Sequence, residues 1–152
     1  MKPPRLYLDS CVLVEGLVAP WSASRGLLIL GRAASVRFVV AEAGIEETER
    51  VLTTRLGEKY GSPARLGEDF RFLLERLQVE RVEHVSAAEF EQARRWIRHW
   101  AGAPVLAAAV KARPDWLITD NTAHFDAQVE RRTGLRIATP EEFLERAGSV
   151  LE

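Results

Sequence analysis

Acidic and amide side chains follow two short apolar segments that lie far apart in the sequence. Asp9 comes directly after Leu6-Tyr-Leu8. Asp120 and Asn121 come directly after the second segment, Trp116-Leu-Ile-Thr119. A carboxylate at the end of a buried strand must be hydrogen-bonded, paired or metal-bound to offset the cost of leaving water. Its oxygens suit a hard cation such as Mg²⁺ or Mn²⁺. The alternatives are that Asp9 or Ser10 caps the following helix and that Asp120-Asn121 forms a turn.

A third candidate acid lies on a predicted amphipathic helix. Glu46, Glu47 and Glu49 all belong to it, and such a cluster usually marks a solvated face. Glu47, however, is two residues after Ile45 and four before Val51. It should therefore flank the apolar stripe, from where its carboxylate could reach inward.

Basic and aromatic residues are concentrated in another predicted helix, which begins with the capping box at residues 86–89 and runs to residue 100. Three of its arginines are candidate contacts for RNA phosphates, with a solvated, Glu-paired face as the alternative: Arg94, Arg95 and Arg98. Trp96 and Trp100, four residues apart, are predicted to be core, the alternative being a platform on which bases stack. His99 is predicted to complement the dipole at the helix end.

Strand-like and helix-like segments alternate along the chain. The predicted strands cover residues 6–8, 36–40, 116–119 and 135–138, with 82–85 a short strand or an extended link. The predicted helices cover residues 11–19, 22–34, 41–56, a segment ending near 78, 86–100, 105–112 and a last one starting after Thr139. This alternation predicts an α/β fold with a central, mostly parallel sheet and helices on both faces. Ligands of such sheets bind beyond the carboxyl ends of the strands.

Length and composition narrow the class of protein. The 152 residues fit one domain over residues 1–152, and the formal net charge of −1 indicates neither a nucleic-acid binder nor an acidic tail. The single cysteine, Cys11, excludes an intrachain disulfide framework. With no signal sequence and no apolar run of membrane-spanning length, we expect a cytoplasmic protein without a membrane partner. No phosphate-binding glycine loop, zinc-protease motif or nucleophile elbow is present, which leaves a Mg²⁺ or Mn²⁺ carboxylate site.

Five segments, in order and at fitting spacing, resemble the PIN domain family, and within it the VapC-like toxin components of toxin–antitoxin pairs. They cover residues 6–13, 38–52, 103–109, 116–125 and 137–144. The resemblance spans nearly the whole chain and implies a single PIN-like domain. It also implies a Mg²⁺- or Mn²⁺-dependent endoribonuclease acting on single-stranded RNA, with an antitoxin partner and a tendency to form homodimers.

The resemblance also assigns roles to individual residues. Asp9, Glu47 and Asp120 would be catalytic, and together with Asn121 they would form the metal site. Ser10 and Thr119 would support them, with Thr119 steadying Asp9 or a water molecule.

One position departs from the family pattern. The third acid of the family should stand where this chain has Gly102. The acidic site is therefore expected to be partly degenerate. This leaves an alternative, a catalytically decayed PIN-fold module that binds RNA or protein. A receiver-like or flavodoxin-like module would need an acidic pair or a phosphate-binding loop after the first strand, and Asp9-Ser10-Cys11 supplies neither.

Overall fold

The computed structural model describes residues 2–151, without the side chains of residues 55 and 149–151. Five parallel strands form one sheet in the order β3-β2-β1-β4-β5. Their bounds are β1 Arg5–Leu8, β2 Arg37–Ala41, β3 Glu80–Val82, β4 Trp116–Ile118 and β5 Ile137–Ala138. The predicted α/β class and parallel sheet are confirmed, and the carboxyl ends of all five strands lie at one edge.

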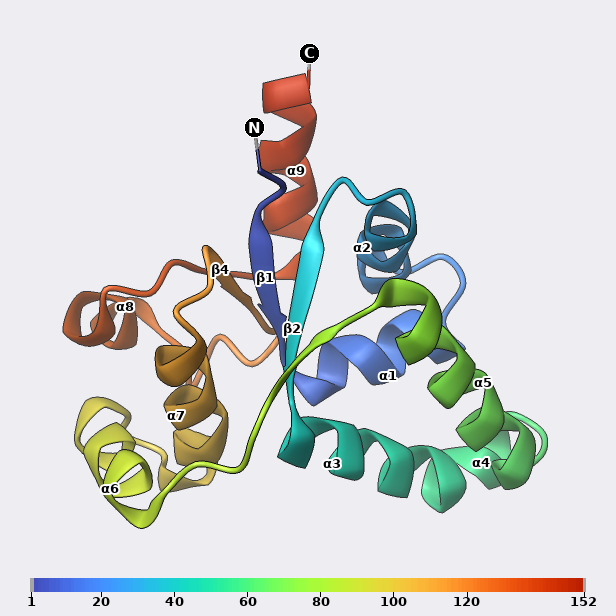
Figure 1. Ribbon diagram of the computed structural model, residues 1–152, viewed down its shortest axis with the longest axis horizontal. Helices are drawn as coiled ribbons and strands as arrows, with labels where there is room; N and C mark the ends of the chain where they lie inside the picture. Colours follow the sequence, from blue (N-terminus) through green and yellow to red (C-terminus); the bar gives the residue numbers. More distant parts are fainter. Residues whose placement is uncertain (1, 152) are drawn as a thin grey trace.

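Helices cover both faces of this sheet (Figure 1). One face carries α1 (Ser10–Val18), α2 (Ala23–Arg32), α3 (Glu42–Thr53), α4 (Arg55–Lys59) and α5 (Pro63–Leu77). The other carries α6 (Ala87–Trp96), α7 (Ala103–Ala112) and α8 (Ala127–Thr133), with the short 3₁₀ turn η1 (Trp100–Gly102) between α6 and α7. The closing helix α9 (Pro140–Leu151) packs on α2.

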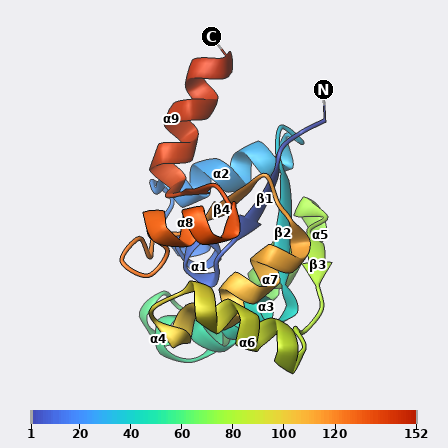
Figure 2. The ribbon, with the colours of Figure 1, turned by 90° about the vertical axis from the view of Figure 1, so that its left-hand side faces the viewer.

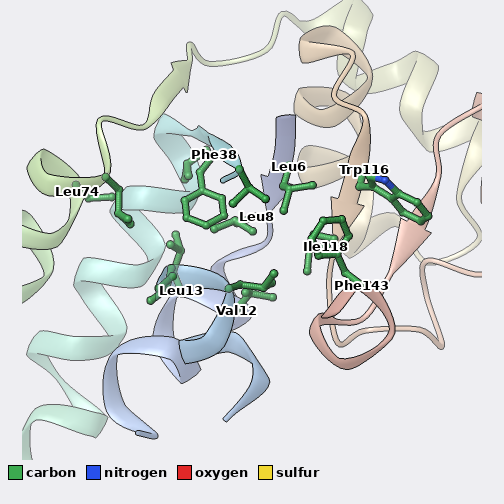
Figure 3. Close-up of a cluster of buried hydrophobic side chains, with 14 of the residues drawn as sticks. Leu6, Leu8, Val12, Leu13, Phe38, Leu74, Trp116, Ile118 and Phe143 are labelled. Atoms are coloured by element: carbon green, nitrogen blue, oxygen red, sulfur yellow. The ribbon is translucent and has the colours of Figure 1, made fainter. Parts of the chain in front are cut away.

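The strands divide their side chains between two hydrophobic cores. Leu6 and Leu8 of β1 face the core under α1, α2 and α5, and the fully buried ring of Tyr7 faces the core under α6 and α7. This alternation is the period of two that a pleated strand imposes. Figure 3 shows the first core, with Phe38 and Ile118 of the neighbouring strands beside Leu6 and Leu8. A sheet buried on both faces holds the strand ends, and hence the polar groups on them, in fixed positions.

The predicted helix over residues 86–100 is too long. Helix α6 ends at Trp96, because Ile97 adopts an extended conformation (φ −124°, ψ 133°) that sends its side chain into the core. The predicted burial of Trp100 is therefore wrong: it lies in η1 and is 69% exposed, while Trp96 is partly buried. The predicted place of His99 at a helix C-terminus is wrong for the same reason.

Three further elements differ from the prediction. The short strand or extended link expected over residues 82–85 is strand β3, which covers residues 80–82 instead. The helix over residues 41–56 is broken at Thr54 into α3 and α4, where the hydroxyls of Thr53 and Thr54 bond backbone carbonyls of the preceding turn. Helix α8 was not predicted, because Val129 is its one buried residue and its apolar periodicity is weak. Its N-cap Asp126 accepts hydrogen bonds from the amides of residues 128 and 129.

Helix α9 runs back from the carboxyl edge of the sheet and projects beyond the sheet at the end of the molecule where the N-terminal segment also lies (Figure 2). Phe143 in its first turns is buried against the Trp116 ring, whose centroid lies 5.9 Å away. Thr139 caps the helix by accepting from the amide of Glu142, as predicted. No single helix in residues 2–151 is long and apolar enough to span a membrane; α1 and α2 reach that length only as a pair, and they are bent by 91°.

Candidate functional site

Asp9 stands at the junction of β1 and α1, where its two carboxylate oxygens have different partners. Oδ1 accepts a hydrogen bond from the amide of Ser10 at 2.7 Å, which is an N-cap contact. Oδ2 accepts from Oγ1 of Thr119, at the end of β4, at 2.8 Å. The carboxylate therefore caps a helix and also ties together the carboxyl ends of two neighbouring strands.

Thr119 is fully buried, although its side chain is polar. Its hydroxyl donates to Asp9 and accepts from the amide of Asn121 at 3.1 Å, so both of its hydrogen-bonding roles are filled. A buried hydroxyl with satisfied partners is held in one rotamer, because breaking either bond would leave a polar group without water. Thr119 thus fixes the direction in which Asp9 points.

Asp120 is exposed and is surrounded by other carboxylates. Partial burial raises the pKa of Asp120, and the negative charges of Glu15, Glu141 and Asp9, in that order, raise it further. These acids come from α1, the first turn of α9 and the end of β1. We refer to Asp9, Glu15, Asp120 and Glu141 together as the acidic side of the site. Mutual repulsion among them would be relieved by a bound cation.

Glu15 and Glu141 were not among the candidate residues found in the sequence. Glu15 is the one charged residue of the otherwise apolar α1, and its Oε1 accepts from the buried Ser24 hydroxyl at 2.8 Å. A lone acid in an apolar helix that starts at a strand end is the signal that could have identified it. Glu141 directly follows Pro140 in the first turn of α9, the helix that the sequence predicts after Thr139.

Cys11 lies beside this acidic side but is not a nucleophile. Burial raises the pKa of its thiol to about 12, and the charge of Asp9 contributes to the same shift. The sulfur is therefore protonated at neutral pH, whereas nucleophilic attack requires the thiolate.

Glu47 lies on a different wall of the site. Ser10, Cys11, Glu15 and Glu47 line a pocket of about 480 Å³ between α1 and α3. The Glu47 side chain is 48% exposed and binds the Arg50 guanidinium through both of its oxygens, at 2.7 and 3.1 Å. The structure thus brings Glu47 and Ser10 to one pocket without a bond between Glu47 and Asp9.

Beyond Asn121, the site becomes aromatic. The Asn121 Nδ2 atom lies 3.0 Å from Nδ1 of His124, and the His124 ring stacks on His99 with centroids 4.0 Å apart and planes 21° apart. The exposed Trp100 follows His99 directly. We refer to His99, Trp100 and His124 as the aromatic side of the site.

Of the three predicted RNA-contacting arginines, Arg94 is paired with Glu91 at 3.1 Å on the same helix. Arg95 and Arg98 are exposed and form no ion pair within the part of the chain that the structure describes. Arg98 is adjacent to the aromatic side in the sequence, whereas Arg94 and Arg95 lie on the last turn of α6.

Gly102 is buried beneath the aromatic side. A Cβ atom there would lie 2.8 Å from Cδ1 of Ile97 and 3.4 Å from Cζ of Phe125. An acid at this position would meet apolar neighbours unless the segment moved. The closest of these contacts is with the flexible end of the Ile97 side chain, so a side chain at position 102 requires Ile97 to shift.

The donors available to a metal at this site are oxygens. Carboxylates of the acidic side and the hydroxyl of Ser10 suit Mg²⁺ or Mn²⁺, which prefer oxygen, more than Zn²⁺, which prefers nitrogen and sulfur. Among the described residues, no group of three or more His, Cys, Asp or Glu side chains is gathered closely enough to hold an ion. The chemistry fits a hard cation, and tight coordination requires side-chain movement.

The fold and the site together define a parallel α/β protein with an acidic centre at the carboxyl edge of its sheet. Residues 5–123 match the PIN domain, and the chain belongs to this family. Strand β5 and helix α9 lie beyond the matched residues, but β5 pairs with β4 in the same sheet.

Solved structures share the fold at low sequence identity. A chain of VapBC2 from Rickettsia felis, solved bound to a DNA fragment from their promoter, is similar with a TM-score of 0.63 and 12% identity, over 89% of this chain and 98% of that one. PAE2754 from Pyrobaculum aerophilum is similar with a TM-score of 0.62 and 15% identity, over 96% of this chain and 90% of that one. No curated protein matches the chain in sequence.

Proposed function

We propose that this PIN-domain protein is an endoribonuclease of the toxin type that cleaves single-stranded RNA and depends on Mg²⁺ or Mn²⁺. The observation that carries the proposal is the 2.8 Å hydrogen bond from Thr119 to Asp9, which joins the carboxyl ends of β1 and β4 next to Asp120 in a PIN domain. Burial of Asp120 and the carboxylates of Glu15, Glu141 and Asp9 raise the pKa of Asp120 at the same edge. Packing several carboxylates together at a strand edge is unfavourable unless a cation neutralises them.

In this proposal, Asp9 and Asp120 hold the cation, which when bound activates water for attack on a phosphodiester. Thr119 fixes the orientation of Asp9 through its hydroxyl, and Glu15 adds negative charge next to Asp120. Glu47 orients water from the opposite wall of the pocket once its carboxylate leaves Arg50. Asn121 anchors the His124 ring through its side-chain amide.

The proposed partners are an antitoxin chain, single-stranded RNA and a second copy of this chain, with the cytoplasm as the place of action. The similarity of fold to a chain of VapBC2 supports an antitoxin partner. Co-expression with the protein encoded beside it, followed by size-exclusion chromatography, tests this: a stable complex supports it, and separate elution contradicts it.

A binding module without catalysis is the second candidate function. It is favoured by the two-point ion pair of Glu47 with Arg50 and by the wide spacing of metal-binding side chains within the described residues. Such a module would bind RNA or protein at the same edge without cleaving a bond.

Cleavage of a fluorescein-labelled single-stranded RNA in Mn²⁺, with EDTA as the blank, separates the two candidates. Asp9→Asn keeps the helix cap, because asparagine caps as well as aspartate. We expect it to lower the rate on the order of 100-fold or more, the size of a lost electrostatic catalyst. The matched control is Asp115→Asn at the opposite end of β4, where the side chain accepts from the amide of Arg5. No cleavage by the unaltered protein, or equal rates for Asp9→Asn, overturns the nuclease.

A further inference from the structure

The aromatic side lies in contact with the acidic side through a continuous run of neighbours. Asp9 is bonded to Thr119, Thr119 to the amide of Asn121, and the Asn121 side chain to His124. His124 then stacks on His99. Any strand with a phosphate held at the acidic side must pass these rings if it leaves the site in this direction.

The rings of the aromatic side are held in place on one face and open to solvent on the other. His124 is half-buried and fixed by Asn121, whereas His99 is the exposed member of the stacked pair. The segment that carries them is anchored in the core, since Ile97 and Gly102 are buried and a Cβ at Gly102 would lie 2.8 Å from Cδ1 of Ile97 and 3.4 Å from Cζ of Phe125. Trp100 nevertheless keeps 69% of its surface exposed. A large aromatic ring on a fixed backbone, left uncovered, is available to stack on another ring.

The charge around these rings suits a polyanion. Residues 92–114 contain five basic residues and no Asp or Glu. Two of the five are paired with glutamates of α6, but Arg95 and Arg98 form no ion pair in the described part of the chain. Aromatic rings interleaved with free guanidinium groups are the arrangement by which proteins hold single strands, with bases stacked on rings and phosphates on cations.

We propose that His99 and Trp100, braced by His124, form a stacking platform for an unpaired base of the RNA strand, with Arg98 contacting a flanking phosphate. That the bound strand is RNA follows from the proposed function, on which this inference rests. The platform selects single strands because a base inside a duplex is already stacked on its neighbours.

Binding in EDTA tests the platform apart from cleavage. The probe is a fluorescein-labelled 12-nucleotide single-stranded RNA, compared with the duplex of the same sequence by fluorescence anisotropy. We expect Trp100→Ala and His99→Ala each to weaken single-strand binding on the order of tenfold, the effect of removing one stacked ring. Both should change duplex binding less than about twofold. Trp21→Ala is the control, because Trp21 is 99% exposed in the α1–α2 connection.

Three results overturn the platform: no binding of the single strand by the unaltered protein, binding of Trp100→Ala within twofold of it, or equal weakening for strand and duplex. The same samples in Mn²⁺ report on the proposed function separately. If the protein cleaves RNA and Trp100→Ala has no effect, the stacking platform is contradicted and the nuclease is not. If Trp100→Ala weakens binding but the protein cleaves no RNA, the nuclease is contradicted and the platform is not. Where both hold, Trp100→Ala raises KM and leaves kcat unchanged, which a general loss of structure would not do.

Discussion

The acidic side and the aromatic side meet at Asn121, yet opposite physical problems shape them. On the acidic side, partial burial raises the pKa of Asp120, and the negative charges of Glu15, Glu141 and Asp9 raise it further. On the aromatic side, stacked rings cover a close-packed backbone and basic residues predominate nearby. In the proposed function, the acidic side holds the cation, and the aromatic side holds a base and a phosphate. A protein that holds a metal next to a nucleic-acid strand requires both.

Removing the Thr119 hydroxyl should produce the largest effect, because this hydroxyl links the two sides. Thr119→Val keeps the shape but frees Asp9 and leaves the amide of Asn121 without its acceptor. We expect Mn²⁺ affinity, measured by calorimetry, to fall about 10- to 100-fold, as when the support of a metal ligand is lost. Thr119→Ser retains the hydroxyl and is the control. Equal loss in both variants would mean that packing of the threonine, rather than its hydrogen bonds, matters.

Filling the space at Gly102 tests whether the aromatic side rests on a close-packed segment. The added methyl of Gly102→Ala would lie 2.8 Å from Ile97. We expect the free energy of unfolding in urea to fall by about 1–3 kcal/mol, the usual cost of overpacking. Gly44→Ala in α3, where the new methyl meets only an ordinary 3.8 Å contact, should instead be neutral or stabilising. Stabilisation by Gly102→Ala would show that the segment is loose.

Neutralising Glu47 should have a small effect on metal binding. Its carboxylate is half-exposed and already paired with Arg50, so we place it outside the metal's ligands. Glu47→Gln should change the Mn²⁺ Kd less than about fivefold, since an exposed ion pair is worth at most about 1 kcal/mol. A tenfold or larger loss of affinity would show that Glu47 contributes to metal binding. The metal site would then include the pocket wall formed by α3.

The smallest effect is expected from neutralising Glu15. Among the three carboxylates that raise the pKa of Asp120, Glu15 raises it most. Glu15→Gln keeps an acceptor for the Ser24 hydroxyl but removes this repulsion. The pKa of Asp120, followed by NMR titration of its carboxyl carbon, should therefore fall. Metal binding requires the ionised carboxylate, so in the unaltered protein it should be lost on acidification at a higher pH than in this variant. An unchanged pKa of Asp120 in this variant would show that Glu15 does not belong to the acidic side.

Most of the fold follows from local sequence signals. Apolar β-rich segments alternate with amphipathic ones, and this alternation was sufficient to predict a parallel sheet covered on both faces. The error at residues 97–100 shows the limit of periodicity. Trp96 and Trp100 have helical spacing, but burial of Ile97 in an extended conformation ends α6, and Trp100 turns to solvent. Tertiary packing decided this boundary, and no local pattern encodes it.

The positions of the candidate residues could be predicted from the sequence where they lie on strand ends, but not where they depend on contacts between distant elements. Asp9, Thr119 and Asp120 end neighbouring strands, so topology alone brings them to one edge. Glu15 and Glu141 reach the same place from two helices, which requires the packing of α1 and α9 to be known. His99 and His124 likewise meet only because η1 packs against the loop after β4.

Binding of a divalent cation by the acidic side can be mapped by adding Mn²⁺ to ¹⁵N-labelled protein and recording which amide signals broaden. Paramagnetic broadening acts over short distances, so the broadened signals locate the ion. We expect early, selective loss of the signals of Asp9, Ser10 and Asp120, and no such loss in Asp9→Asn. Broadening centred on α3 around Glu46 and Glu47, or no selective broadening at all, would contradict cation binding by the acidic side.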